Sequence, residues 1–376
     1  MSGCTEDLFG DIGTLAQLPL AQTAVDYGVD RRGEEGLIEC LLADESTRVV
    51  LVNNGLVAVR RRAGVTAPGA LDCRLDPAAP RPDAAAPQGM MELALLAGPE
   101  VLDEAGQPGR LAIYLGVDCS DNLRRAYVAL DITGAGGVPP QVSGSVDREL
   151  DYERGSLAAR VLQTCDWVEL RSFATCASVR DSGLATSAVA VSTWQRNQRF
   201  CPACGAPVQP ALAGWAQTCT SERDGHRLLF PRIEPAVITA IVDDDDRLLL
   251  QHNVAWRPGF FSVSAGFVEA GESLEHAVRR EAGEEVGLEI GEVRYLGSQP
   301  WPFPASIMLG FRARALGTEV RVDHEEVGSA RWFTRDELLS AVESGEVVLP
   351  GRASIARHMI EQWYGSPLGE QMWLYA

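Results

Sequence analysis

The sequence predicts an α+β fold in three successive parts. Residues 1–195 combine apolar strand patterns with a helical stretch, residues 199–231 hold paired cysteines, and residues 232–376 place strands around one strongly patterned helix. A chain of 376 residues is long enough for two or three domains. We therefore expect a β-rich and helical N-terminal scaffold domain, a short cysteine knuckle and a C-terminal domain with a mixed sheet.

The N-terminal part contains strand patterns that are followed by a helical pattern. Residues 49–60 carry an Asn-Gly turn between two apolar runs, which is typical of a β-hairpin. Apolar runs at 91–98, 110–117 and 125–132 predict further strands, and the Ala, Leu and Val spacing of 156–196 predicts helix. Because this part shows no internal repeat and no catalytic constellation, we interpret it as a scaffold or dimerisation module.

Composition and charge restrict the class of protein. The chain has 52 acidic and 33 basic residues, a net charge of −19, which disfavours a general polyanion-binding surface because such surfaces depend on Lys and Arg. It has no apolar run of the roughly 18–20 residues that a membrane span needs, and its N-terminus lacks the pattern of a secretory signal. Nine scattered cysteines fit a reducing compartment. We expect a cytoplasmic protein without a membrane segment.

The knuckle has the spacing of a zinc-ribbon-like site. Cys201 and Cys204 are two residues apart, so that both thiolates can hold one tetrahedral ion, and Cys219 follows at the distance of a second pair. The expected fourth cysteine is replaced by Glu222, and the nearest candidate for a fourth ligand is His226. The spacing therefore predicts a structural Zn²⁺ site. A knuckle held by packing without metal, and a redox-active cysteine pair, are the alternatives.

One helix is the strongest feature of the C-terminal part. Gly266 and Gly271 permit a tight loop before Ser273, which is a favourable N-cap residue. Apolar residues then recur at helical spacing, so a short amphipathic helix is expected to begin at Leu274. The spacing of Glu272 and Arg280 suggests an ion pair that braces the loop against this helix.

Three glutamates are expected on one face of that helix. Glu281, Glu284 and Glu285 are three and four residues apart, which places them side by side. Crowded carboxylates repel one another unless a cation neutralises them, and Mg²⁺ or Mn²⁺ is bound jointly by carboxylates and substrate phosphates. The alternative is a solvated charged face, which is the usual meaning of a Glu-rich helix.

A proline-rich aromatic segment follows. Residues 298–306 read Ser-Gln-Pro-Trp-Pro-Phe-Pro-Ala-Ser, in which three prolines alternate with Trp301 and Phe303. Prolines restrict the backbone to an extended conformation, so the rings are presented at low entropic cost. Such a wall can stack a planar base, although a proline-braced turn whose rings fill a core would have the same sequence.

Residues 266–288 fill every fixed position of the Nudix box, and the chain resembles the hydrolases that carry it. With the upstream cysteine pair and residues 298–306, it resembles the NADH pyrophosphatase branch of that family. The motifs cover about 199–363, whereas residues 1–195 are similar only in architecture. The resemblance implies an α/β/α sandwich for residues 232–376.

The resemblance also implies a reaction. Members of this branch hydrolyse NAD(H) to nicotinamide mononucleotide and AMP with Mg²⁺ or Mn²⁺, and remove NAD caps from RNA 5′ ends by cutting the same bond. A homodimer is implied too. Two alternatives remain open: a Nudix pyrophosphatase for ADP-ribose or dinucleoside polyphosphates, and a non-catalytic NAD-responsive regulator, in which the glutamates need not have been retained.

Site residues follow from the resemblance by position. Glu281, Glu285 and Glu326 (beside Glu325), with the backbone carbonyl of Ala265, would bind the catalytic metal. Glu284 or Glu285 would accept the proton of the attacking water, with Glu285 favoured. The implied substrate-binding residues are Phe230, Gln299, Pro300, Trp301, Pro302, Phe303, Pro304, Ala305, Ser306 and Ala356. Phe230 stands where the family usually has Tyr, and Ala356 would approach substrate through its backbone.

Overall fold

The computed structural model describes residues 13–15, 17–61, 91–118, 124–134 and 156–369. These residues form two compact units. Of the described residues, unit 1 takes those up to Pro19, Ile233–Trp301 and those from Ser306 to 369; unit 2 takes those in Leu20–Arg232 and Pro302–Ala305.

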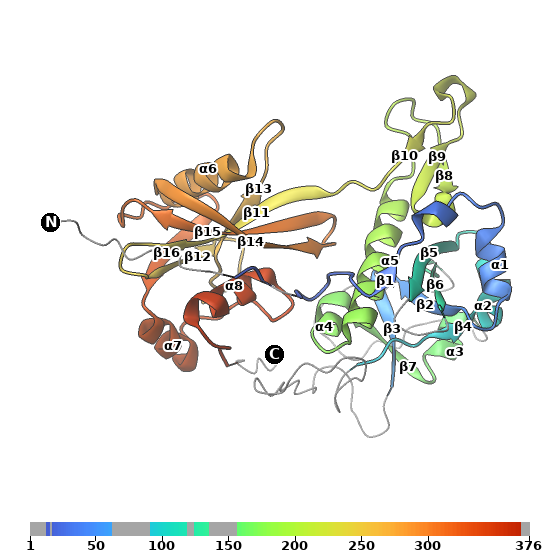
Figure 1. Ribbon diagram of the computed structural model, residues 1–376, viewed down its shortest axis with the longest axis horizontal. Helices are drawn as coiled ribbons and strands as arrows, with labels where there is room; N and C mark the ends of the chain where they lie inside the picture. Colours follow the sequence, from blue (N-terminus) through green and yellow to red (C-terminus); the bar gives the residue numbers. More distant parts are fainter. Residues whose placement is uncertain (1–12, 16, 62–90, 119–123, 135–155, 370–376) are drawn as a thin grey trace. The chain divides into compact units, whose positions relative to one another are not determined.

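Unit 1 is built around a mixed six-stranded sheet (Figure 1). The strand order is β14-β15-β11-β12-β16, and β13 pairs with β11. Strands β11 and β15 are parallel, whereas the other pairs are antiparallel. The strands are β11 (Glu234–Val242), β12 (Leu248–Asn253), β13 (Ser264–Phe267), β14 (Ile290–Trp301), β15 (Ser306–Ala315) and β16 (Val327–Phe333). The predicted mixed sheet is confirmed.

Helices cover both faces of this sheet. On β11, Val237 and Ile241 pack in the core beneath α6 (Leu274–Val286), whereas Ile238 and Val242 pack in the core beneath α7 (Arg335–Ser344) and α8 (Ile355–Tyr364). This alternation follows from the period of two of a strand, because successive side chains point to opposite faces. The α/β/α sandwich is therefore confirmed (Figure 1).

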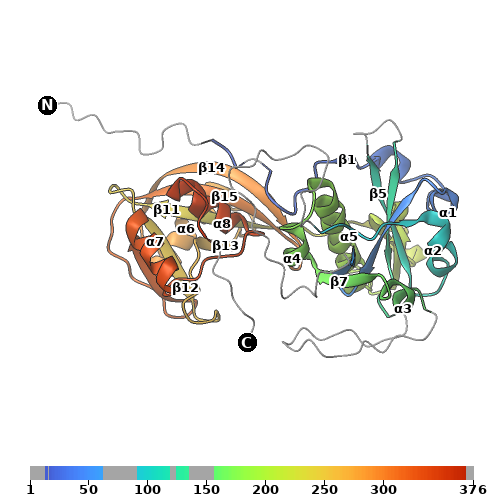
Figure 2. The same ribbon diagram turned by 90° about the horizontal axis from the view of Figure 1, so that it is seen from below.

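Unit 2 contains a seven-stranded mixed sheet in the order β1-β5-β6-β2-β3-β7, with β4 paired to β2. Its strands are β1 (Val25–Asp26), β2 (Arg48–Asn53), β3 (Leu56–Arg60), β4 (Leu96–Ala97), β5 (Leu111–Asp118), β6 (Ala126–Asp131) and β7 (Cys165–Glu169). Helices α1 (Leu37–Ala43) and α2 (Gly98–Ala105) lie on one face, and α5 (Val179–Asn197) lies on the other (Figure 2). The turn η1 (Val29–Arg31) and helices α3 (Leu157–Val161) and α4 (Leu170–Ala174) complete it.

Two expectations for this unit were wrong in part. The predicted strand 91–98 is reduced to β4, because Gly98 opens helix α2, with Pro99 in the first turn and Glu100 bonding back to the N-cap backbone. The predicted helical stretch 156–196 is interrupted by β7, which pairs along the whole of β3. Both errors arise where a strand pairing decides the conformation of a short apolar run.

The cysteine knuckle forms a small sheet of its own within unit 2. Its order is β10-β9-β8, from β8 (Val208–Ala211), β9 (Ala216–Cys219) and β10 (Leu228–Leu229), with short turns η2 (Leu212–Gly214) and η3 (Glu222–Asp224). Buried Gln195 of α5 donates to the carbonyls of Gly214 and Ala216 at 2.7 and 3.0 Å, which fastens the knuckle to α5.

Candidate active site and cysteine knuckle

The glutamate helix α6 begins where the sequence predicts, at Leu274. The Ser273 hydroxyl accepts a hydrogen bond from the backbone N–H of His276 at 3.3 Å, which satisfies a free donor of the first turn. Gly287 closes the helix in the left-handed conformation, with φ of 69°.

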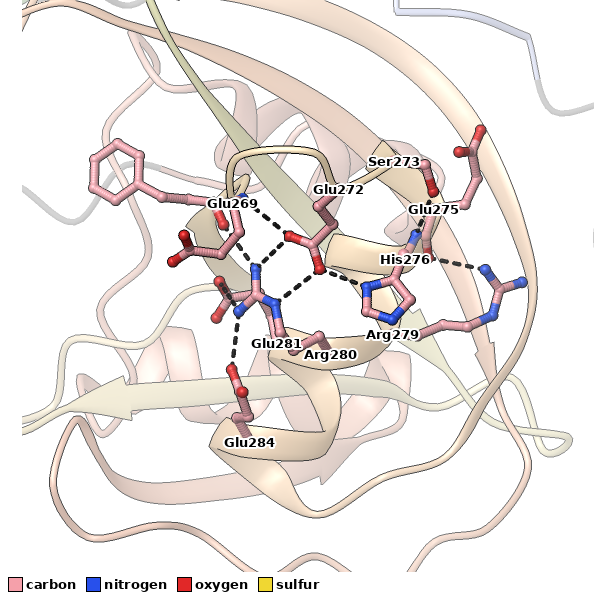
Figure 3. A network of polar contacts seen from close by, with 10 residues as sticks. Glu269, Glu272, Ser273, Glu275, His276, Arg279, Arg280, Glu281 and Glu284 are labelled. Carbon is pink, nitrogen blue, oxygen red and sulfur yellow. Dashed lines mark hydrogen bonds and ion pairs between the residues drawn. The ribbon is translucent and has the colours of Figure 1, made fainter.

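Arg280 connects the loop before α6 to its glutamates (Figure 3). It donates two bonds to Glu272 at 2.9 and 2.8 Å, which confirms the predicted ion pair. It also donates at 2.9 Å to Glu281, to Glu284 and to the carbonyl of Phe267. The Arg280 guanidinium lowers the pKa of Glu272, and Glu272 in turn raises the pKa of Arg280. Arg280 thus fixes loop and helix together.

Glu285 is the buried carboxylate of the site, with 5% of its surface exposed. Its Oε2 accepts hydrogen bonds from Ser264 Oγ at 2.6 Å and from Gln251 Nε2 at 3.0 Å. Burial, together with the negative charges of Glu281 and Glu326, raises the pKa of Glu285 to about 7, against the opposing effect of the two hydrogen bonds. Neither Ser264 nor Gln251 was predicted from the sequence.

The carboxylates predicted to bind the catalytic metal influence one another's protonation. Burial raises the pKa of Glu281, and the charges of Glu284 and Glu326 raise it further. Glu326 lies just before β16, where its carbonyl accepts a bond from Val254 N–H at 2.9 Å. Glu284 is exposed and bonded to Arg280, so it contributes less directly to this cluster. Glu281, Glu285 and Glu326, which we call the glutamate cluster, are therefore linked by their electrostatic influence on one another.

Strand β13 carries the remaining predicted ligand. Ser264 and Gly266 are alternate residues that meet Glu285 and Glu281 of α6, with Ala265 between them. A Cβ at Gly266 would lie 1.9 Å from Cδ of Glu281, so only glycine leaves room for that carboxylate. Carboxylates with a backbone carbonyl form an oxygen-only donor set, which suits Mg²⁺ or Mn²⁺. The residues present fit such a cation.

Gln299 lies inside unit 1 rather than on its surface, with 0% of its surface exposed. Its Nε2 donates to the carbonyls of Pro19 and Ala353, both at 2.8 Å, and its Oε1 accepts from Ile355 N–H at 2.8 Å. These bonds fix the start of α8, which contains the buried Ala356. The side chain of Gln299 therefore supports the predicted site from within.

The other predicted substrate residues are more accessible. Trp301 and Phe303 are half-buried, and Phe303 has the Arg171 guanidinium 4.1 Å from its ring centre, a cation–π contact within unit 2. Phe230, also in unit 2, is 61% exposed. Of the remaining residues of the segment, Pro302 is buried, Pro304 is exposed, and Pro300, Ala305 and Ser306 are half-buried.

The three knuckle cysteines also converge. Ligand atoms of Cys201, Cys204, Cys219 and Asp224 all lie within 4.8 Å of one another. The Sγ atoms of Cys204 and Cys219 are 3.4 Å apart, and Cys201 Sγ lies 3.2 Å from Asp224 Oδ2. The expected fourth ligand, His226, is not in this group, because its Nδ1 lies 3.1 Å from the carbonyl oxygen of Cys219. Three thiols and one carboxylate suit a tetrahedral zinc ion.

Two sequence families match the chain. Residues 232–352 match the NUDIX domain, and residues 196–228 match the NADH pyrophosphatase zinc ribbon domain. The first match covers the six-stranded sheet and the glutamate helix of unit 1, and the second covers the knuckle sheet with its cysteines. Both motif assignments are thereby confirmed.

Named relatives are similar over about half of the chain. A Mycobacterium bovis (strain BCG / Pasteur 1173P2) protein named NAD-capped RNA hydrolase NudC is 46% identical over 207 residues, 52% of this chain and 64% of that protein. A Homo sapiens protein named NAD-capped RNA hydrolase NUDT12 is 38% identical over 194 residues, 49% of this chain and 42% of that protein. The chain thus matches less than two thirds of the length of either relative.

Proposed function

We propose that this chain, whose residues 232–352 and 196–228 match the NUDIX domain and the NADH pyrophosphatase zinc ribbon domain, hydrolyses the diphosphate bond of NAD(H). The products would be nicotinamide mononucleotide and AMP. The observation that carries the proposal is the occurrence of both domains, in this order, in one chain whose helix α6 bears Glu281 and the buried Glu285. The relatives' names favour a second substrate with the same bond, the NAD cap of an RNA 5′ end.

The cation site of this reaction would be formed by Glu281, Glu285 and Glu326 with the Ala265 carbonyl. A divalent cation bound there would supply positive charge to offset the diphosphate and the charge that develops on phosphorus. Arg280 would hold Glu281 in place from outside the cluster, through the bond at 2.9 Å. The protein's part is therefore to keep the carboxylates fixed before substrate arrives.

Glu285 is our choice for the group that accepts a proton from the attacking water. The water oxygen bonds to one phosphorus, the anhydride P–O bond breaks, and the water proton passes to the carboxylate. Glu285 is buried and held by hydrogen bonds from Ser264 and Gln251, so its carboxylate is fixed in place for this step. Glu284, by contrast, is exposed and engaged by Arg280.

A comparison of substrates tests the proposed function. Turnover of NADH, NAD⁺, NAD-capped RNA, ADP-ribose and diadenosine polyphosphates would be measured with Mg²⁺ and with Mn²⁺. We expect NADH or NAD-capped RNA to have the highest kcat/KM. A preference for ADP-ribose or dinucleoside polyphosphates would move the chain to the alternative pyrophosphatase. Tight NAD binding without turnover would support the regulator instead.

The aromatic segment gives a separate prediction. Trp301→Ala or Phe303→Ala should weaken NADH binding by about 1–3 kcal/mol if the ring stacks on a base. Tyr295→Ala is the matched control, because Tyr295 is a 49% exposed aromatic residue earlier on strand β14. KM for NADH and the melting temperature would be measured for all three variants. Lost stability with unchanged KM would show that the rings fill a core.

Cation affinity should depend on pH. Because the pKa of Glu285 is about 7, the metal-free protein holds a proton there in acid, and a cation must displace it. Affinity for Mn²⁺ should fall about tenfold per pH unit below 7 and level off above it. Calorimetry at pH 6 in buffers of different ionisation heat should detect the released proton. Glu284→Gln should keep this profile, and equal affinity at pH 6 and pH 8 would contradict the assignment.

We also propose that the knuckle holds structural zinc with Asp224 as the fourth ligand. Asp224 Oδ1 is held by Arg227 at 3.2 Å, while Oδ2 faces the thiol of Cys201. Protein purified without chelator should contain about one zinc per chain, because thiolates bind zinc tightly. After dialysis against chelator, Asp224→Ala should lose zinc faster than the parent, and His226→Ala should retain it.

Two results of this zinc analysis would contradict the proposal. Zinc lost from His226→Ala but kept by Asp224→Ala would restore the histidine as the fourth ligand. A folded, active parent protein without zinc would show that packing alone holds the knuckle.

Location and assembly remain predictions. No helix in the described part of the chain combines the length and the apolar composition needed to cross a bilayer. We propose a cytoplasmic homodimer; cell fractionation and light scattering after size-exclusion chromatography would test the two properties.

A further inference from the structure

Two uncharged side chains from different strands hold the Glu285 carboxylate. Ser264 Oγ lies 2.6 Å and Gln251 Nε2 lies 3.0 Å from the same oxygen, Oε2. All three residues are nearly inaccessible, with 5% of Ser264, 4% of Gln251 and 5% of Glu285 exposed. Hydrogen bonds that end on a buried charge are stronger than those between neutral groups.

The sheet register directs both side chains toward α6. Ser264 is paired with Thr239 on β11, which points to the same face as Val237 and Ile241 beneath α6. On β12, Gln251 is two residues after Leu249, which packs in that same core. Since alternate residues of a strand share a face, the strand positions place Ser264 and Gln251 against this helix.

The contacts leave one side of the carboxylate available. Ser264 and Gln251 both donate to Oε2, so Oε1 is the oxygen left for a cation or a water. The buried Oε1 of Gln251 has no hydrogen-bond partner in the described structure. A buried acceptor without a partner is unfavourable, which points to a water or ligand at that position.

We propose that Gln251 and Ser264 are positioning residues for the diphosphate chemistry. They fix Oε2 of Glu285 so that Oε1 is presented to the cation, and Gln251 Oε1 orients a water beside it. The inference rests on the proposed function, because it assigns Glu285 to the cation. Removing a hydrogen-bond partner of a metal ligand typically lowers metal affinity or activity by about 10- to 100-fold.

Direct Mn²⁺ binding tests the proposal without substrate. Ser264→Ala and Gln251→Leu should each weaken Mn²⁺ binding by about 10- to 100-fold, measured by calorimetry or by electron paramagnetic resonance. Ser264→Thr, which keeps the hydroxyl, should restore most of the affinity. Gln251→Asn keeps the amide but shortens its reach, so it should behave like Gln251→Leu.

The matched control is Ser262→Ala. Ser262 is a buried serine, 6% exposed, two residues before Ser264, and the structure shows no bond from its side chain to Glu285. This variant should keep the parental Mn²⁺ affinity. With NADH at saturating Mn²⁺, kcat should fall in Ser264→Ala and in Gln251→Leu while KM stays within about twofold, because neither side chain contacts substrate.

Two results would overturn the proposal. One is a folded Ser264→Ala or Gln251→Leu protein with parental Mn²⁺ affinity and kcat. The other is a lower melting temperature with unchanged Mn²⁺ affinity, which would assign the two residues to stability alone. If Ser264→Ala does not fold, the Gln251 variants decide. If the parent protein does not hydrolyse NADH, the proposed function fails, whereas the Mn²⁺ titrations still decide whether the two residues position Glu285.

Discussion

Glu281→Gln and Glu285→Gln are each expected to lower kcat for NADH by at least about 100-fold while the protein still folds. Each change removes one negative charge from the cluster that would hold the cation, and the amide that replaces it is a poor ligand for Mg²⁺ or Mn²⁺. The metal-free Glu285→Gln protein should be at least as stable as the parent above pH 7. Burial raises the pKa of Glu285 to about 7. Ionising this carboxyl therefore lowers the stability of the folded state as the pH rises from about 4.5 to 7, and the glutamine variant avoids that loss.

Glu284→Gln is the matched control for this experiment. Its side chain is 62% exposed and bonded to Arg280 on the same helix, outside the buried part of the cluster. Its kcat should stay closer to that of the parent than the kcat of either other variant. Steady-state kinetics at several Mn²⁺ concentrations, with a melting curve for each variant, would measure the difference. Near-parental turnover in Glu281→Gln or Glu285→Gln would remove that residue from the cation site.

Gly266→Ala should lose activity to a similar degree. The added Cβ would lie 1.9 Å from Cδ of Glu281, and 2.0 and 2.3 Å from its two carboxylate oxygens. Either the Glu281 carboxylate or strand β13 must therefore move, and small displacements at a catalytic site lower the rate strongly. We expect kcat and Mn²⁺ affinity to fall together, measured by kinetics and calorimetry.

Gly283→Ala, on α6 itself, should have the opposite effect. A Cβ at Gly283 would meet nothing within 4 Å. Replacing glycine by alanine inside a helix stabilises it by about 0.5–1 kcal/mol, so this variant should melt higher and keep its kcat. Equal activity in the Gly266 and Gly283 variants would show that Glu281 does not need the space left by Gly266.

The sequence predicted those parts of unit 1 that depend on local patterns. The start of α6 at Leu274 agrees with expectation, because apolar periodicity and N-caps act over a few residues. Strand β7 was missed because its conformation depends on pairing with β3, which is distant in the chain. Local propensity carries no information about such pairing.

In the candidate active site, too, the residues predicted correctly are those that depend on local spacing. The spacing on α6 predicted the face that bears Glu281 and Glu285, but Ser264 and Gln251 lie 21 and 34 residues before Glu285. Their contact with it is set by sheet register. Gln299 belongs to a motif that suggests substrate contact, yet its partners Pro19 and Ala353 are 280 and 54 residues away.

In the cysteine knuckle, too, only part of the site could be predicted from the sequence. The three cysteines were predicted from spacing alone, and they converge. The fourth position depends on a turn in which Gly225 and His226 both have left-handed φ, at 64° and 51°. This turn follows Asp224, whose carboxylate lies beside the thiol of Cys201. The same turn places the imidazole of His226 next to the backbone carbonyl of Cys219. The spacing of residues along the sequence does not show which of these two side chains the turn places beside the thiols.

The bonds of Gln299 have a consequence for the order in which the chain folds during synthesis. Unit 1 is a discontinuous domain: Leu18 lies in its core, Leu15 N–H bonds to the Leu296 carbonyl at 2.6 Å, and Gln299 links Pro19 to the start of α8. The N-terminal segment leaves the ribosome long before Leu296, Gln299 and α8 do. It therefore has no partners to pack against while unit 2 is being synthesised. Unit 2 can therefore fold first, and the core of unit 1 that contains Leu18 and α8 can be completed only after α8 has been made.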